Sequence, residues 1–313
     1  MIQIEKAKVP TMYFIGVTTT KSSIMKLFPE WAKALGLNNA VLKGIDLEIH
    51  ADPEEYREVV KFIKEDELSL GALVTTHKID LYEAAKDLFD ELDPYARMFG
   101  ELSSISKKDG KLCGHAKDPI TSALALERFV PETYWQDHEG ELLLLGAGGS
   151  AIAISSALLD PKHGDNTPSR VVITDINESR MNEIRHIIQK VNPAIQVDYH
   201  LVGDTEENGR LLESLKPHSL VINATGMGKD RPGSPLPGNA KFPEDSLVWE
   251  LNYRGEREFM HHALDQKEAL NLHVEDGWIY FLHGWTQVIA EVFHLPMTKE
   301  RFERIEDTSD SMR

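Results

Sequence analysis

The sequence predicts an α/β fold, and two observations carry this prediction. Short apolar or β-branched runs alternate with longer segments whose apolar residues recur at helical spacing, as expected for sheets covered by helices. In the middle of the chain, four leucines lead directly into a glycine-rich turn, GAGG, and small apolar residues follow. A strand, a tight glycine turn and a helix in this order are typical of the first βαβ unit of a Rossmann-type domain.

Residues 1–120 are predicted to form an α/β domain of their own, which binds the substrate and carries out the chemistry. We expect strands at 11–16, 41–49 and 70–74, helices at 24–35, 53–65 and 81–93, and a hairpin of 102–105 and 111–114. Gly36 is suited to end the first helix, because glycine adopts left-handed backbone angles without strain.

Residues 121–275 are predicted to form the Rossmann-type dinucleotide-binding domain, with a cleft between the two domains. We expect helices at 121–129, 151–159, 178–191, 208–215 and 256–266, and strands at 142–145, 170–175, 196–201, 219–222, 247–251 and 272–274. Residues 226–245 are rich in Gly and Pro and are predicted to form a loop. A helix at 278–293 is expected to return to the first domain, so that 276–313 complete it, and the tail after Ile305 is expected to fray.

Composition argues against several classes of protein. A length of 313 residues is sufficient for two domains, and no run approaches the ~20 apolar residues that span a bilayer, so we expect a soluble, cytoplasmic protein. The formal charge of -17 disfavours nucleic acid and anionic membranes as partners. The single Cys113 and the scattered histidines lack the ligand spacing of a metal site, so no metal is expected.

The glycine turn predicts contacts to a dinucleotide. Backbone N–H groups at the positive N-terminus of a helix bind a pyrophosphate, and the residues placed to supply them are Gly146, Ala147, Gly148, Gly149 and Ser150. Asp175 ends the next predicted strand, where a carboxylate accepts hydrogen bonds from the adenosine ribose. The same residue is also a candidate N-cap for the helix at 178–191.

Asp175 also predicts the choice of cofactor. A carboxylate at this position repels a 2′-phosphate, so the sequence favours NAD over NADP. Arg180 lies one helical turn later and is able to bind a phosphate, so use of NADP or of both cofactors stays open.

The order of motifs along nearly the whole chain resembles the shikimate dehydrogenase family. The motifs that carry the resemblance are GVTTTKSSIM from Gly16, LVTTHK up to Lys78, GELSS, GHAKDP around Asp118, GAGG, NATGMG from Asn223, the segment from Glu250 to Tyr253, and DGWIYFLHG from Asp276. The resemblance implies that Lys78 and Asp118 form the proton-transfer pair. It also implies that Asn223, Thr225 and Gly277 contribute to the cofactor site.

A lysine and an aspartate suit this role chemically. Oxidation of a secondary alcohol requires the hydroxyl proton to leave, and reduction of the ketone requires an acid to protonate the alkoxide. An ammonium stabilises the oxyanion and donates a proton, while a carboxylate within hydrogen-bond reach orients it. Without the resemblance, Lys78 and Asp118 would be read as a surface lysine and a loop aspartate.

The sequence departs from the family where the family binds shikimate. Ile24 replaces the second serine of the first motif, Ala116 replaces an asparagine, and Gly284 replaces the glutamine of the last motif. We therefore expect another substrate, a cyclitol, hydroxylated ring acid or polyol. The residues expected to contact it are Ser22, Thr75, Ser103, Tyr253 and His283.

Three alternatives remain open at this point. The protein is an authentic shikimate or quinate dehydrogenase if the lost contacts are dispensable. Methylene-tetrahydrofolate dehydrogenases share a two-domain shape and a catalytic lysine, although the motif order favours the shikimate type. A non-catalytic NAD- or metabolite-binding regulator would explain the lost contacts but not the retained Lys78 and Asp118. The sequence does not distinguish a monomer from a homodimer.

Overall fold

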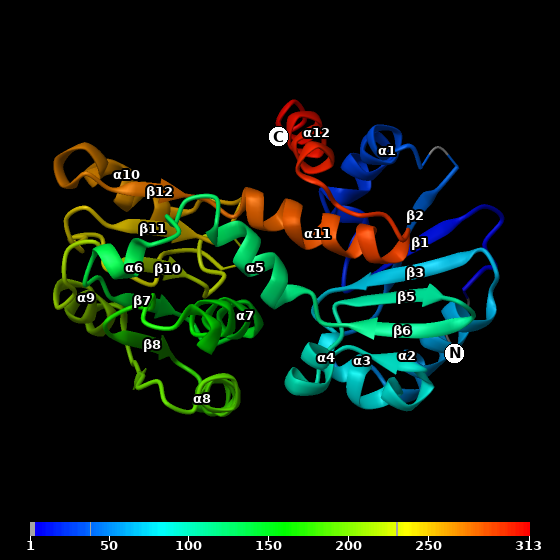
Figure 1. The fold of residues 1–313 in the computed structure, drawn as a ribbon, viewed down its shortest axis with the longest axis horizontal. Helices are drawn as coiled ribbons and strands as arrows, with labels where there is room; N and C mark the ends of the chain where they lie inside the picture. The colour runs from blue at the N-terminus through cyan, green and yellow to red at the C-terminus, as the bar shows by residue number, and fades with distance from the viewer. Residues whose placement is uncertain (1–3, 38, 230) are drawn as a thin grey trace. The chain divides into compact units, whose positions relative to one another are not determined.

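The computed structural model describes residues 4–37, 39–229 and 231–313, so parts of the predicted first domain (1–3 and 38) and of the predicted loop (230) lie outside the described residues. The chain divides into two compact units (Figure 1). Unit 1 comprises Met1–Lys117 and Leu282–Arg313, and unit 2 comprises Asp118–Phe281. The second division falls within one long helix, α11 (Trp278–Val292).

Unit 1 is built on a mixed six-stranded sheet in the order β2-β1-β3-β5-β6-β4. Its strands are β1 (Thr11–Gly16), β2 (Val41–Asp46), β3 (Ser69–Val74), β4 (Glu91–Leu92), β5 (Ser104–Lys108) and β6 (Lys111–His115). β1 pairs in parallel with β2 and β3, whereas β5 runs antiparallel to β3 and β6. The predicted hairpin is therefore confirmed, and it extends the parallel strands into one sheet.

The helices of unit 1 follow the sequence signals closely at their ends. They are α1 (Ile24–Leu35), α2 (Pro53–Glu65), α3 (Lys78–Ala85), α4 (Pro94–Phe99) and α12 (Lys299–Asp310). α1 ends at Gly36, whose φ of 76° is left-handed, as predicted. The Asp52 carboxylate accepts a hydrogen bond from the Glu54 N–H and thereby caps α2.

Unit 2 is built on a parallel six-stranded sheet in the order β12-β11-β10-β7-β8-β9, which is the Rossmann order. The strands are β7 (Leu142–Leu145), β8 (Val171–Asp175), β9 (Asp198–Leu201), β10 (Leu220–Asn223), β11 (Leu247–Glu250) and β12 (His273–Glu275). Every adjacent pair is parallel, so all six strands end at one edge. The predicted α/β fold with a Rossmann-type domain is confirmed.

Helices cover the sheet of unit 2 because its four central strands, β7, β8, β10 and β11, are buried on both sides. The helices are α5 (Asp118–Leu126), α6 (Tyr134–Asp137), α7 (Gly149–Leu158), α8 (Glu178–Val191), α9 (Thr205–Glu213) and α10 (Glu258–Leu270). All four leucines of β7 are fully buried. Leu143, Leu145 and Val221 pack with Leu212 of α9 and Phe259 of α10 in one core, which fixes the central strands and hence the glycine turn after β7.

Two predicted elements of unit 1 are wrong. The helix expected at 81–93 begins earlier, at Lys78, and α3 ends at Ala85; the remaining residues form a 3₁₀ turn and the short strand β4. The tail after Ile305 does not fray, because it belongs to α12, which packs against α1. Ile305 is fully buried, and Trp31 of α1 donates its indole N–H to the Ser309 hydroxyl at 2.8 Å. Tertiary packing therefore orders a segment whose own composition is polar.

Candidate functional site

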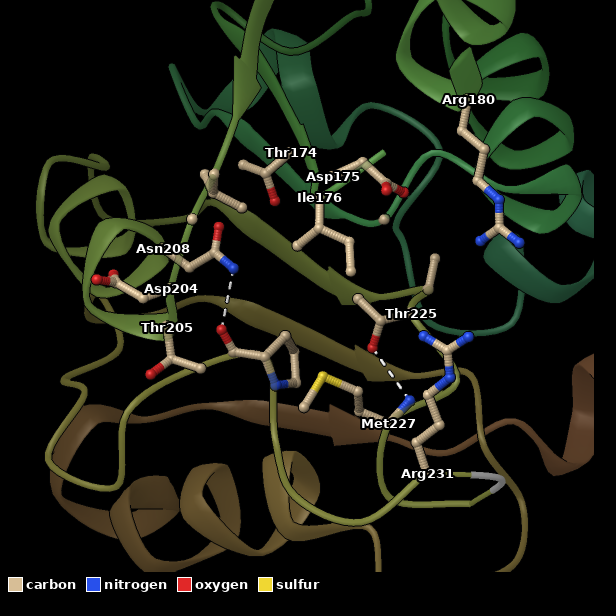
Figure 2. A pocket seen from close by; sticks show the side chains of 15 residues that line it. Thr174, Asp175, Ile176, Arg180, Asp204, Thr205, Asn208, Thr225, Met227 and Arg231 are labelled. Atoms are coloured by element: carbon tan, nitrogen blue, oxygen red, sulfur yellow. Dashed lines mark hydrogen bonds between the residues drawn. The ribbon is translucent and has the colours of Figure 1, made fainter. Parts of the chain in front are cut away.

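A pocket opens at the carboxyl edge of the unit 2 sheet, where the strand order reverses between β7 and β10 (Figure 2). Such a reversal is the usual ligand site of open α/β sheets. The cavity volume is about 270 Å³, and the residues that line it are Gly146, Thr174, Asp175, Ile176, Arg180, Val202, Gly203, Asp204, Thr205, Asn208, Ala224, Thr225, Met227, Arg231 and Pro235. Four residues singled out in the sequence, Gly146, Asp175, Arg180 and Thr225, meet here.

The glycine turn is open on the side that a dinucleotide would approach. Gly146 has a φ of 105°, and a Cβ atom there would lie 2.8 Å from the Ala224 carbonyl oxygen, so only glycine fits. A Cβ atom on Gly148 or Gly149 would meet no neighbouring atom within 4 Å. Gly148 is the N-cap of α7 and Gly149 is its first residue, and N–H groups in the first turn of a helix favour an anion. The turn therefore has the space and the donors that a pyrophosphate needs.

Asp175 is held rigidly at the end of β8. One carboxylate oxygen accepts a hydrogen bond from the Ala147 N–H at 2.7 Å, and the other accepts one from the Asn177 N–H at 2.8 Å. The carboxylate thus joins β8 to the glycine turn while lining the pocket. The predicted N-cap role is wrong, because Asn177 caps α8 by accepting a hydrogen bond from the Arg180 N–H.

Positive charge enters the same pocket from the first turn of α8, which carries Arg180, and from the loop that carries Arg231. Figure 2 shows the guanidinium groups of Arg180 and Arg231 on the same side of the pocket as Thr225. Ile176, beside Asp175, is 71% exposed and offers an apolar surface at the rim. An exposed isoleucine next to a fixed carboxylate suits a flat aromatic group attached to a ribose.

The loop after β10 forms the wall of the pocket opposite Asp175. Asn223, predicted to contact the cofactor, is fully buried, and its amide is used inside the protein. Its Oδ1 accepts hydrogen bonds from the Thr225 N–H and hydroxyl, while its Nδ2 donates to Glu250 at 2.9 Å. The Thr225 hydroxyl in turn accepts a hydrogen bond from the Met227 N–H at 3.1 Å, the bond drawn in Figure 2. Asn223 therefore shapes the pocket rather than lining it.

Glu250 is a buried carboxylate that the sequence analysis did not assign to the site. It ends β11 with no exposed surface, and burial raises its pKa to about 7 even though hydrogen bonds from Asn252 and Asn223 and the charge of Arg257 oppose the rise. A carboxyl group that titrates near neutral pH is unusual and clusters with functional sites. The signal in the sequence was an acidic residue at the end of an otherwise apolar strand, WE.

Unit 1 holds several of the predicted catalytic and substrate residues at the ends of its strands. Thr75 directly follows β3, and Lys78 is the first residue of α3; both are partly exposed. Ser22 ends the 3₁₀ turn after β1. Ser103 is buried, and its hydroxyl accepts a hydrogen bond from the Lys117 N–H at 2.7 Å. That bond fixes the segment immediately before Asp118.

The remaining predicted residues have different surroundings. Asp118 is partly exposed and begins α5. Tyr253 lies against Phe281, with ring centroids 4.5 Å apart. Gly277 permits close backbone packing, because a Cβ atom there would lie 1.9 Å from the Leu251 carbonyl oxygen. His283 is buried and stacks on Phe302 of α12, with centroids 4.0 Å apart, which is a packing environment.

Much of the pocket was not predicted from the sequence. The unpredicted lining residues come chiefly from the loops after β8, β9 and β10, and they are Thr174, Ile176, Val202, Gly203, Asp204, Thr205, Asn208, Ala224, Met227, Arg231 and Pro235. The Asn208 amide donates to the Pro235 carbonyl oxygen at 3.0 Å and so ties two of these loops together. The only sequence signal for them was their position after strands of a parallel sheet.

Comparison with known proteins gives related sequences but no matching family model. Shikimate dehydrogenase (NADP(+)) of Lactococcus lactis subsp. cremoris is 28% identical over 180 residues, which cover 56% of this chain and 59% of that protein. Shikimate dehydrogenase (NADP(+)) of Bacillus cereus is 32% identical over 198 residues, which cover 61% and 64%. The matched region thus spans about three fifths of the length of these curated relatives.

Solved structures share the fold over almost the whole chain. Quinate dehydrogenase from Corynebacterium glutamicum in complex with NAD has a TM-score of 0.74 at 19% identity, covering 96% of this chain and 98% of that one. Shikimate 5-dehydrogenase from Listeria monocytogenes in complex with shikimate and NAD has a TM-score of 0.73 at 18% identity, covering 100% and 99%. 5-Ketofructose reductase of a Gluconobacter species has a TM-score of 0.67 at 17% identity, covering 96% and 99%.

Fold and site together define an α/β protein that contains a Rossmann-type domain with a pocket at its switch point. The chain is similar in sequence to shikimate dehydrogenases and in fold to shikimate and quinate dehydrogenases, which agrees with the resemblance that the motif order indicated.

No helix in the described part of the chain is long and apolar enough to cross a membrane. Among residues 4–37, 39–229 and 231–313, no group of three or more His, Cys, Asp or Glu side chains is arranged to hold a metal ion.

Proposed function

We propose that the protein is an NAD-dependent oxidoreductase that interconverts a secondary alcohol and a ketone on a cyclitol, hydroxylated ring acid or polyol. The observation that carries the proposal is the pocket at the switch point, which combines an open glycine turn with a fixed carboxylate at the end of β8. The names of the related proteins, which are dehydrogenases, support the same class of reaction.

The residues around the glycine turn fit a nicotinamide dinucleotide. The N–H groups at Gly148, Gly149 and Ser150 would hold the pyrophosphate, and Asp175 would accept hydrogen bonds from the adenosine ribose. When bound, the nicotinamide supplies the group that accepts or donates a hydride. Asp175 favours NAD because its carboxylate, fixed by two N–H donors, cannot turn away from a 2′-phosphate.

Proton transfer is assigned to Lys78 and Asp118. Lys78 stands at the start of α3, directly after the strand β3, and its ammonium would donate the proton to the alkoxide or stabilise it. Asp118 would orient that ammonium and pass protons to water. The hydrogen bond from the Lys117 N–H to Ser103 supports this role by fixing the chain one residue before Asp118.

The substrate is proposed to differ from shikimate, because Ile24, Ala116 and Gly284 replace residues with which the family holds it. The structural likeness to a 5-ketofructose reductase supports this view, since the fold also serves an enzyme named for a substrate other than shikimate. Thr75, Ser22 and Tyr253 are the proposed contacts. Authentic shikimate or quinate dehydrogenase activity is the second candidate, favoured by the names of the curated relatives.

The test is turnover followed by nicotinamide absorbance. Purified protein is mixed with NAD or NADP and with shikimate, quinate, other cyclitols or open-chain polyols. We expect Lys78→Ala to lower kcat by about 10²- to 10⁴-fold, as for loss of a general acid–base group. The control is Lys86→Ala, an exposed lysine at the other end of α3 that pairs with Glu83. Nucleotide binding without turnover in the wild type would instead indicate a regulatory binding protein.

A further inference from the structure

The wall of the pocket at residues 224–227 is held at both ends: the Ala224 N–H donates to the Leu145 carbonyl oxygen at 2.8 Å, and Met227 forms a β-bridge with Arg231. It is a loop between β10 and β11, and its contact with the glycine turn is close: the Ala224 carbonyl oxygen would lie 2.8 Å from a Cβ atom on Gly146. Thr225 and Met227 line the pocket from this loop, as Figure 2 shows. A shift of the wall would therefore change the space available above the turn.

Glu250 supports this wall through two asparagines. One carboxylate oxygen accepts a hydrogen bond from Asn223 Nδ2 at 2.9 Å, and the other accepts one from the Asn252 N–H at 2.9 Å. Both asparagines also donate through Nδ2 to the Met227 carbonyl oxygen, Asn223 at 3.3 Å and Asn252 at 2.8 Å. Glu250, the two amides and the wall thus form a closed ring of hydrogen bonds.

The direction of these bonds requires an acceptor at position 250. Asn223 Oδ1 already accepts from the Thr225 N–H and hydroxyl, so the amide cannot flip and Nδ2 must face Glu250. The Asn252 partner is a backbone N–H and is always a donor. An ionised carboxylate accepts both bonds, whereas a protonated carboxyl group keeps only one good acceptor and turns an O–H toward a donor.

The charged groups nearest to this carboxylate do not neutralise it fully. Arg257, which precedes α10, acts on Glu250 through its charge, but its guanidinium is paired with Asp276 at 2.9 Å. Asn223 and Asn252, on the neighbouring elements, carry no charge. Because burial outweighs these contributions, the pKa of Glu250 is raised to about 7. Its protonation state therefore changes over the neutral range.

We propose that the Glu250 carboxylate is a positioning residue that holds the 224–227 wall in the conformation that binds the dinucleotide. It touches neither substrate nor cofactor and acts through Asn223 and Asn252. This inference rests on the proposed function, because the ligand of the pocket is the nicotinamide dinucleotide proposed above. A consequence is that the wall loosens, and NAD binds more weakly, as the pH falls below neutral.

The first experiment needs no ligand. Hydrogen exchange of the Thr225 and Met227 amides is compared between the wild type and Glu250→Gln, in which one of the two donors faces an NH₂ group. We expect faster exchange in Glu250→Gln. The matched control is Glu141→Gln, another buried carboxylate, which precedes β7 at the far edge of the same sheet and accepts the Lys216 N–H. Equal exchange in the wild type and Glu250→Gln would overturn the proposal.

The second experiment measures the dissociation constant of NAD between pH 6 and pH 8. One lost hydrogen bond is worth ~1 kcal/mol, so Glu250→Gln is expected to bind NAD about fivefold more weakly at pH 8. Its affinity should not depend on pH, whereas that of the wild type should fall toward pH 6. In turnover, KM for NAD should rise while kcat stays unchanged, a split that a merely structural defect would not give.

The outcomes separate the two proposals. A wild type that binds neither NAD nor NADP would refute the proposed function and, with it, the positioning of a dinucleotide by Glu250. A wild type that binds NAD, with a Glu250→Gln variant of equal affinity and equal pH dependence, would refute the role of Glu250 alone. Weaker binding in Glu250→Gln, with Glu141→Gln unchanged, would support both.

Discussion

Replacement of Glu250 by glutamine should change how the stability of the protein depends on pH. In the folded protein the pKa of this buried carboxyl group is about 7, against an ordinary value of 4.5. Because the folded-state pKa is raised, the group's contribution to stability is fully present below pH 4.5 and is lost as the pH rises through 7. The difference of about 2.5 units corresponds to about 3 kcal/mol. Glutamine does not titrate and escapes this loss.

At low pH the two proteins should be about equally stable, because a protonated carboxyl group and a glutamine amide each offer one good acceptor to the two donors. We therefore expect Glu250→Gln to be about 3 kcal/mol more stable than the wild type at pH 8 and to lose this advantage toward pH 5. Urea unfolding of both proteins at several pH values gives the difference directly. Glu256→Gln, which removes an exposed carboxylate, corrects for the change in net charge. A difference between wild type and Glu250→Gln that is constant from pH 5 to pH 8 would refute the reasoning.

Three further predictions concern other parts of the chain. Asp175→Asn should lower the free energy of unfolding by about 1 to 3 kcal/mol, because one of two N–H donors loses its acceptor. It should also lower the ratio of kcat/KM for NAD to kcat/KM for NADP, and an unchanged ratio would contradict the assigned role of Asp175. Gly277→Ala should destabilise the fold by about 3 kcal/mol through its clash with Leu251, as thermal unfolding would show. Gly148→Ala, its control, meets open space and should weaken NAD binding instead. Ser309→Ala should cost about 2 kcal/mol, because the buried Trp31 indole N–H loses its acceptor; unchanged urea unfolding would show that this bond does not hold α12.

The sequence predicted helix bounds best where a residue suited to cap a helix stood at the end of a segment with apolar residues at helical spacing. Helices α1, α2 and α8 have the predicted bounds, since Gly36, Asp52 and Asn177 lie at their ends and satisfy the backbone there. The prediction failed at 81–93, where Leu88 and Phe89 continue an apolar pattern although α3 ends at Ala85 and a 3₁₀ turn and the strand β4 follow. Periodicity alone does not distinguish these cases, because the interruption depends on pairing between β4 and β6.

The sequence by itself determined the Rossmann-type turn and the resemblance to shikimate dehydrogenases, because both depend on residues that are adjacent in the chain. Only the tertiary structure decided what the buried polar groups do. It paired Glu250 with Asn223, 27 positions away, and Trp31 with Ser309, 278 positions away. Such partners are chosen by strand order and helix packing. A buried donor or acceptor needs a hydrogen-bond partner, and the fold determines which distant residue lies within reach. The neighbouring residues in the sequence do not show which residue that is.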